Sequence, residues 1–142
     1  MNHEEKTLAL HIRQTTIPDL GQRLHELLGY YIPIEVEWES FRNAPLSALH
    51  YLRNYIERLQ KTLEQIAGEE KEASSLAAQL RRISIRQVPS NEAVELSFAD
   101  GALCSMVNFN NIEGIPAETE LHKTIGHFVA MTTTLRSHEH IR

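Results

Sequence analysis

Histidine can take part in more kinds of chemistry than any other residue type in this chain. The sequence contains eight histidines in 142 residues. An imidazole can bind a metal ion or transfer a proton, and helical metal sites often place two ligands four residues apart. No two histidines have that spacing, and His122 and His127 would point about 140° apart on a helix. Glu118 and His122 do have it, but their pairing is more typical of an exposed ion pair. The sequence therefore predicts no metal site and no cofactor.

Nucleophilic catalysis would need an activated serine or cysteine. Cys104, the single cysteine, falls in a predicted strand without the glycine turn or helix N-terminus that activates a thiol. The chain also lacks a glycine-rich phosphate loop, because Asp100 and Gly101 are explained by a hairpin turn. We therefore expect no catalytic residue, which favours a protein that is not an enzyme. A single cysteine also excludes an internal disulfide and favours a reducing, cytoplasmic location.

Three glutamates follow one another at alternate positions near residue 37. Neighbouring carboxylates can serve acid–base catalysis within a cleft, but an acidic strand face is usually just solvated. Aromatic residues lie at both ends of the segment, and aromatic side chains beside acidic ones are typical of protein-binding surfaces. We therefore predict a binding surface made of the acidic and aromatic residues of this segment: Glu35, Glu37, Glu39, Trp38, Phe41, Tyr30 and Tyr31. For Trp38 the alternative role is an anchor in the core of a small sheet.

The leading functional hypothesis is a non-enzymatic protein-interaction module whose acidic surface binds a protein partner, and the charge favours a basic one. A second hypothesis is a small-molecule binder or enzyme. Its pocket would lie between the sheet and the long helix and would be lined by four side chains: His50, Tyr51, Tyr55 and Cys104. A third hypothesis is a homodimeric scaffold, because the apolar repeat of the long helix also suits a dimer seam.

Composition excludes several broad classes of protein. The chain is 42% hydrophobic and 23% charged, which is typical of globular domains. A formal net charge of −5 argues against nucleic acid and anionic membranes as partners, and the basic cluster at 81–86 is interpreted as charge at a helix end. No apolar run reaches the roughly 18 residues of a membrane span, and the N-terminus lacks the basic start of a secretory signal. We expect one domain over 1–142, with frayed ends at 1–6 and 137–142.

Hydrophobic periodicity predicts the elements of the N-terminal half. Residues 7–16 fit either a strand or a helix, because their apolar residues suit both periods. A helix is predicted over 18–28, with Thr16 as its N-cap and Gly29 as its C-terminal stop. The segment 32–38 then alternates apolar and polar residues, which predicts a half-buried strand.

The most regular pattern lies in the predicted helix 46–66. Its apolar residues are spaced three and four apart: Leu49, Leu52, Ile56, Leu59, Leu63 and Ile66. Burying six such side chains contributes roughly 9–18 kcal/mol before entropy is counted, so this face must pack against something. The helix is predicted to end near Gly68. A second helical segment is predicted over 69–80, with Ala73 and Leu80 among its inward-facing residues.

Three further strands are predicted over 83–88, 93–99 and 102–109. A two-residue type I′ turn at Asp100 and Gly101 would join the last two. That turn fixes the register, so that three cross-strand pairs form: Phe98 with Leu103, Leu96 with Ser105, and Val94 with Val107. Cys104 then lies on the face opposite the core.

The remaining C-terminal part is predicted as a helix behind Pro116, with a strand over 128–135 as the alternative. The fold class that combines these elements is α+β. A small, mainly antiparallel four-stranded sheet is expected to pack against the long amphipathic helix 46–66 and flanking helices. Because a long crossover follows it, the strand 32–38 is expected at a sheet edge or parallel to its neighbour.

Overall fold

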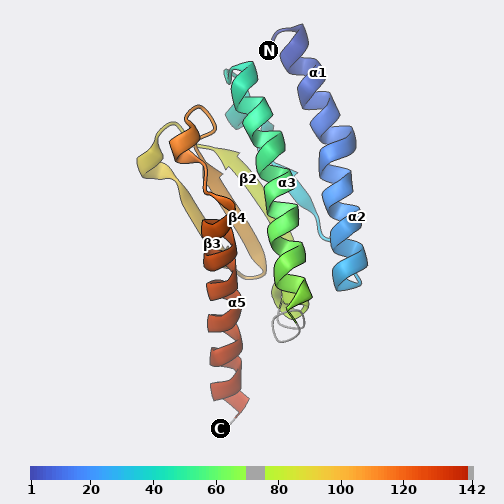
Figure 1. Cartoon of the computed structure of the whole chain (residues 1–142), viewed down its shortest axis with the longest axis vertical. Coiled ribbons are helices and arrows are strands. Elements are labelled where there is room, and N and C mark those ends of the chain that lie inside the picture. The colour runs from blue at the N-terminus through green and yellow to red at the C-terminus, as the bar shows by residue number, and fades with distance from the viewer. Residues whose placement is uncertain (70–75, 141–142) are drawn as a thin grey trace.

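The computed structural model describes residues 1–69 and 76–140, and the side chains of residues 1–69 and 76–131. It is an α+β structure in which one four-stranded sheet carries a layer of helices, as predicted. The longer elements in chain order are α1 (His3–His11), α2 (Ile17–Leu28), β1 (Ile34–Val36), α3 (Leu46–Gly68), β2 (Arg82–Gln87), β3 (Glu95–Ala99), β4 (Ala102–Val107) and α5 (Glu118–His140). Figure 1 shows α3 in front of the sheet, with α1 and α2 along one side of it and α5 along the other.

The two N-terminal helices form one helical segment, joined by a π-helical turn, Ile12–Thr16. The strand alternative for residues 7–16 is therefore wrong, and Thr16 makes no capping bond because the backbone is already helical there. Pro18 explains the π turn, since its ring would clash with a carbonyl one turn earlier in a regular α-helix. Gly29, at φ 88°, ends α2 as predicted.

Strand β1 is shorter than the predicted strand 32–38. The chain leaves the sheet after Val36 and forms a 3₁₀ helix, Trp38–Phe41, which buries the ring of Phe41 completely. Ser40 fixes this turn, because its hydroxyl accepts a hydrogen bond from the backbone N–H of Gln87 on β2. The strand lies at the edge of the sheet and parallel to β2, which confirms the predicted position.

Helix α3 confirms the pattern of the predicted helix 46–66. All six of its heptad-spaced aliphatic side chains have 0% exposure, and the helix ends at Gly68 as predicted. The predicted second helical segment falls partly on residues 70–75, so Ala73 lies outside the described residues. Residues 76–79 are helical, and Leu80 is buried, in agreement with that prediction.

The sheet is mixed, which corrects the expectation of a mainly antiparallel sheet. Its strand order is β1-β2-β4-β3, in which β1 with β2 and β2 with β4 are parallel and only β3 with β4 is antiparallel. The reason is that β4, the second strand of the hairpin, pairs with β2 on one side and with β3 on the other. It thereby becomes a central strand, with Leu103 and Val107 buried against the helices.

The hairpin itself has the predicted register. Asp100 and Gly101 both have positive φ, 53° and 81°, as a type I′ turn requires. Phe98 pairs with Leu103 and Leu96 pairs with Ser105. Val94 lies outside the ladder, because a 3₁₀ turn at Asn91–Ala93 delays the start of β3 to Glu95.

Residues 128–135 belong to α5, so the helical alternative is confirmed and the strand alternative is wrong. Leu121, Ile125 and Val129 are buried along this helix, which packs on α3. The fraying expected for 137–142 falls partly on residues 141–142, which lie outside the described residues. No helix within the described part of the chain is long and apolar enough to span a membrane.

Candidate functional site

The candidate site is the sheet face that the helices leave uncovered. Because α1, α2, α3 and α5 lie on one side of the sheet (Figure 1), alternate strand residues project from the other side. The strand pairing places Glu35, Ser84, Cys104 and Ser97 in one row across all four strands. We call the side of the sheet that carries this row the open face.

A hollow of about 560 Å³ lies on the open face. Glu35 and Glu37 form its rim at the β1 edge, and Cys104 and Met106 of β4 form its floor. The two glutamates are exposed, whereas the floor residues are half-buried. Arg86 of β2 lies beside Met106 in the ladder and also lines the hollow.

The charges around the hollow are only partly balanced. Arg86 Nε lies 3.4 Å from Glu37 Oε2, and both side chains are more than half exposed (57% and 52%), so solvent screens this pair strongly. The carboxylate of Glu35 has no hydrogen bond or ion pair to any side chain that the structure describes. The hollow therefore combines an apolar floor with a free acidic group at its edge.

The aromatic residues predicted for the binding surface mostly lie elsewhere. Phe41 is fully buried, with its ring 5.5 Å from that of Phe109. Trp38 is half-buried, and the Arg13 guanidinium lies 4.4 Å from its ring centroid in a cation–π contact. Trp38 thus holds the π-helical turn against the 3₁₀ helix that follows β1, as a core anchor would.

Tyr30 also has a structural role. Its hydroxyl lies 2.6 Å from the carbonyl oxygen of Leu80 and close to that of Ala77, and it accepts a hydrogen bond from Arg81 Nη1 at 2.8 Å. Burial raises the pKa of Tyr30, while the charge of Arg81 acts in the opposite direction. The contacts tie the segment before β1 to the helical end that precedes β2.

Two of the predicted surface residues are exposed but lie outside the hollow. Tyr31 is 71% exposed and stacks on His25 with 3.9 Å between ring centroids. Glu39 pairs with Arg42 at 3.1 Å in the 3₁₀ turn. Of the predicted surface, the structure therefore brings only Glu35 and Glu37 into one site.

The four predicted pocket residues lie in four different places. Tyr55 is completely buried between α3 and the sheet, His50 lies in a groove between α1 and α3, and Cys104 lies on the open face. Tyr51 lines a hollow of about 420 Å³ between α3 and the segment that leads into α5. The structure does not bring them together. The space between α3 and the sheet is filled by core side chains, among them Tyr55 and Phe109, whose rings pack edge to face, 5.6 Å apart.

The two residues considered as metal ligands, Glu118 and His122, pair with different side chains. Glu118 pairs with Lys61 at 3.4 Å, and His122 Nε2 lies 3.1 Å from a carboxylate oxygen of Glu69. Within the described residues, no group of three or more His, Cys, Asp or Glu side chains is placed to hold a metal ion.

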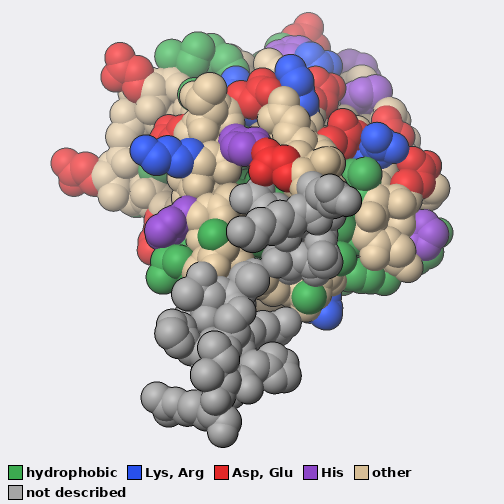
Figure 2. Space-filling model, turned by 60° about the horizontal axis from the view of Figure 1, so that its bottom comes forward, with side chains coloured by type: hydrophobic (Ala, Val, Ile, Leu, Met, Phe, Trp, Pro, Cys, Tyr) green, Lys and Arg blue, Asp and Glu red, His purple; other side chains and the backbone are tan. Residues whose placement is uncertain are grey.

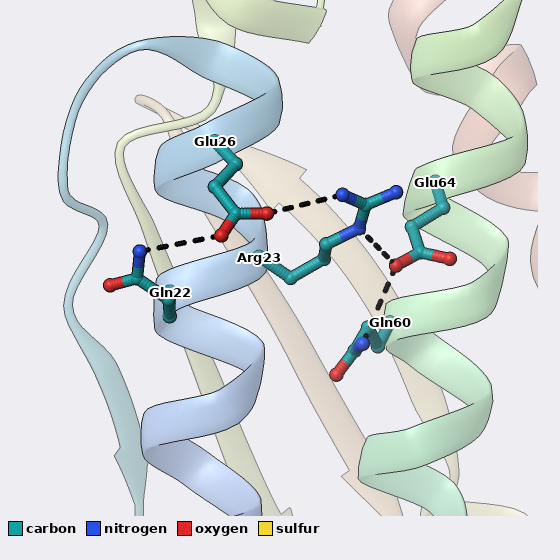
Figure 3. Close-up of polar contacts among 5 residues, drawn as sticks. All are labelled: Gln22, Arg23, Glu26, Gln60 and Glu64. Atoms are coloured by element: carbon teal, nitrogen blue, oxygen red, sulfur yellow. Dashed lines mark hydrogen bonds and ion pairs between the residues drawn. The ribbon is translucent and has the colours of Figure 1, made fainter.

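The surface of the helical layer is neither uniformly acidic nor uniformly basic. In the view of Figure 2, acidic and basic side chains lie next to one another. Figure 3 shows one cause: Arg23 of α2 bridges Glu26 on its own helix and Glu64 on α3, with Nε 2.5 Å from Glu64 Oε1. The hydrogen bond to Glu64 is the main cause of a raised pKa for Arg23. These carboxylates are neutralised locally, unlike that of Glu35.

Sequence reasoning missed Arg86 and Met106 as members of the site. Arg82, Ser84 and Arg86 alternate with buried isoleucines, which is a signal for a solvated strand face. That signal could have placed Arg86 there, but the basic cluster was interpreted as helix-end charge. The place of Met106 beside Arg86 could be found only from the strand order, because it depends on the pairing of β4 with β2. Comparison of the chain with known protein families, with curated proteins and with solved structures gives no match.

Proposed function

We propose that this protein is a non-enzymatic interaction module that binds a protein partner through the open face. The partner would place a lysine or arginine side chain in the hollow. The observation that carries this proposal is the hollow itself, in which the free carboxylate of Glu35 borders a floor of Cys104 and Met106. A long basic side chain suits it, because its aliphatic stem can cover the floor while its charged end reaches the glutamates.

The topology of the sheet gives independent support for a partner. Sheets made only of parallel strands are nearly always covered on both faces, because their connections place helices on each side. Here two of the three strand pairs are parallel, yet the described helices cover only one face. A bound protein would supply the missing layer and remove Cys104 and Met106 from water, which is favourable.

The chemistry of the hollow supports a binding role over a catalytic one. The hydroxyl and thiol groups among its lining residues are those of Ser84, Ser105 and Cys104, and no histidine lies among these residues to act as a base. The cytoplasmic location stays a prediction, based on the single cysteine. A homodimer in which a second copy covers the open face would be seen as a concentration-dependent increase of the mass in solution.

A peptide selection on the purified protein tests the proposal. Peptides selected from a random library should carry lysine or arginine, and the double variant Glu35→Lys/Glu37→Lys should weaken their binding by about tenfold or more. The matched control is Glu57→Lys/Glu92→Lys, which makes the same change in net charge at exposed positions away from the hollow. Binders without basic residues, or equal losses in both double variants, would refute the proposal.

A further inference from the structure

Another cavity lies on the helical side of the molecule, where α1 crosses the first turns of α3. This groove has a volume of about 540 Å³. Its floor is apolar: Leu8 of α1 is 9% exposed, and Leu46 of α3 is half-buried. It is separate from the open face, because α1 and α3 belong to the layer that covers the other side of the sheet.

Nitrogen-bearing side chains outnumber carboxylates on the walls of this groove. His3 and His11 come from α1, and His50 and Arg53 come from α3, whereas Glu4 is the one carboxylate among the lining residues. Arg53 forms no ion pair with any side chain that the structure describes. Its Nη2 instead lies 3.3 Å from Nδ1 of His50. A hydrogen bond from the guanidinium to Nδ1 leaves the proton of a neutral imidazole on Nε2, which can then donate.

We infer that the groove between α1 and α3 binds an acidic amphipathic helix of a protein partner. The groove offers an apolar floor, formed by Leu8 and Leu46, next to the guanidinium of Arg53, which has no ion pair within the described residues. A leucine on the partner helix would lie on Leu8 and Leu46, and a glutamate one turn away would accept hydrogen bonds from Arg53 and His50. This partner has the opposite charge to the one proposed for the open face, so the two surfaces select different ligands.

Fluorescence anisotropy with two synthetic helical peptides tests this inference. Both peptides carry leucine at the same positions, and one has glutamate where the other has lysine. The acidic peptide should bind about tenfold more tightly or better. Arg53→Glu should remove that preference, whereas Arg42→Glu should not, because it makes the same charge change at an exposed site outside the groove. The open-face variant Glu35→Lys/Glu37→Lys should retain acidic-peptide binding, which separates this inference from the proposed function.

Thermal unfolding monitors whether each variant is folded, and Arg53→Gln replaces Arg53→Glu if the charge reversal prevents folding. The inference is overturned if the two peptides bind equally, if neither binds, or if the Arg53 and Arg42 variants lose the same affinity.

Discussion

The hydroxyl of Tyr55 on α3 donates a hydrogen bond to Oγ of Ser105 on β4 at 2.8 Å. Both side chains are buried, with Tyr55 at 0% and Ser105 at 1% exposure. The bond joins the centre of the long helix to a central strand of the sheet. It also satisfies two polar groups in an otherwise apolar core, which explains why a tyrosine and a serine are tolerated there.

Removing the hydroxyl of Tyr55 should destabilise the fold. Tyr55→Phe leaves Ser105 Oγ buried without its partner, which should lower the free energy of unfolding by about 1–3 kcal/mol. Urea denaturation measures the change. Tyr51→Phe is the matched control, because the Tyr51 hydroxyl makes no hydrogen bond within the described residues, and it should have little effect. Adding Ser105→Ala to Tyr55→Phe should recover part of the loss, and an additive further loss would contradict this account.

The buried phenol also predicts alkaline instability. Burial raises the pKa of Tyr55 well above its ordinary value of 10.0, so the folded protein keeps a proton that the unfolded chain releases. The free energy of unfolding should therefore fall as the pH rises above about 10. Tyr55→Phe should flatten this decrease when denaturation is repeated across that range. Tyr30, whose pKa is also raised, should account for a smaller part of the decrease, and that part should remain in Tyr55→Phe. An unchanged slope in Tyr55→Phe would refute the assignment.

Gly101 should not tolerate a side chain. Its φ is 81°, and a Cβ there would lie 2.7 Å from Arg81 Cγ and 3.0 Å from the carbonyl oxygen of Gln79. Gly101→Ala should therefore destabilise the protein by more than about 1 kcal/mol. Gly126→Ala is the control, because Gly126 lies in α5 and, within the described residues, no atom beyond the adjoining helix backbone lies within 4 Å of its would-be Cβ. That change should stabilise the helix by about 0.5–1 kcal/mol, and thermal unfolding of the pair should shift in opposite directions.

Local patterns in the sequence predicted the elements well, and the reason is visible in α3 and the hairpin. The heptad of α3 encodes which face is buried, and the turn at Asp100 and Gly101 encodes the register of its neighbours. The strand order was not predictable in this way. Insertion of β4 next to β2 depends on contacts between distant segments, such as Arg82 with Ala102.

The candidate site was predicted only in part, because a local sequence pattern relates only some of its residues. Glu35 and Glu37 share a strand, so alternation alone places them on one face. The aromatic residues were assigned to the surface because they lie nearby in sequence. Phe41 is nevertheless buried against Phe109, and Tyr30 binds the backbone of Leu80, in contacts that join distant parts of the chain. No local period encodes such contacts.

The reactivity of Cys104 should report on occupancy of the hollow. As the single cysteine, it gives a specific signal with a thiol reagent, and its partly exposed position on the floor lets a reagent reach it in the free protein. A basic peptide selected on the open face should slow its modification, because the aliphatic stem of the bound side chain covers the floor. The protection should disappear in Glu35→Lys/Glu37→Lys and persist in Glu57→Lys/Glu92→Lys. A peptide that binds tightly yet leaves the modification rate unchanged would lie elsewhere on the molecule, and the hollow would not be its site.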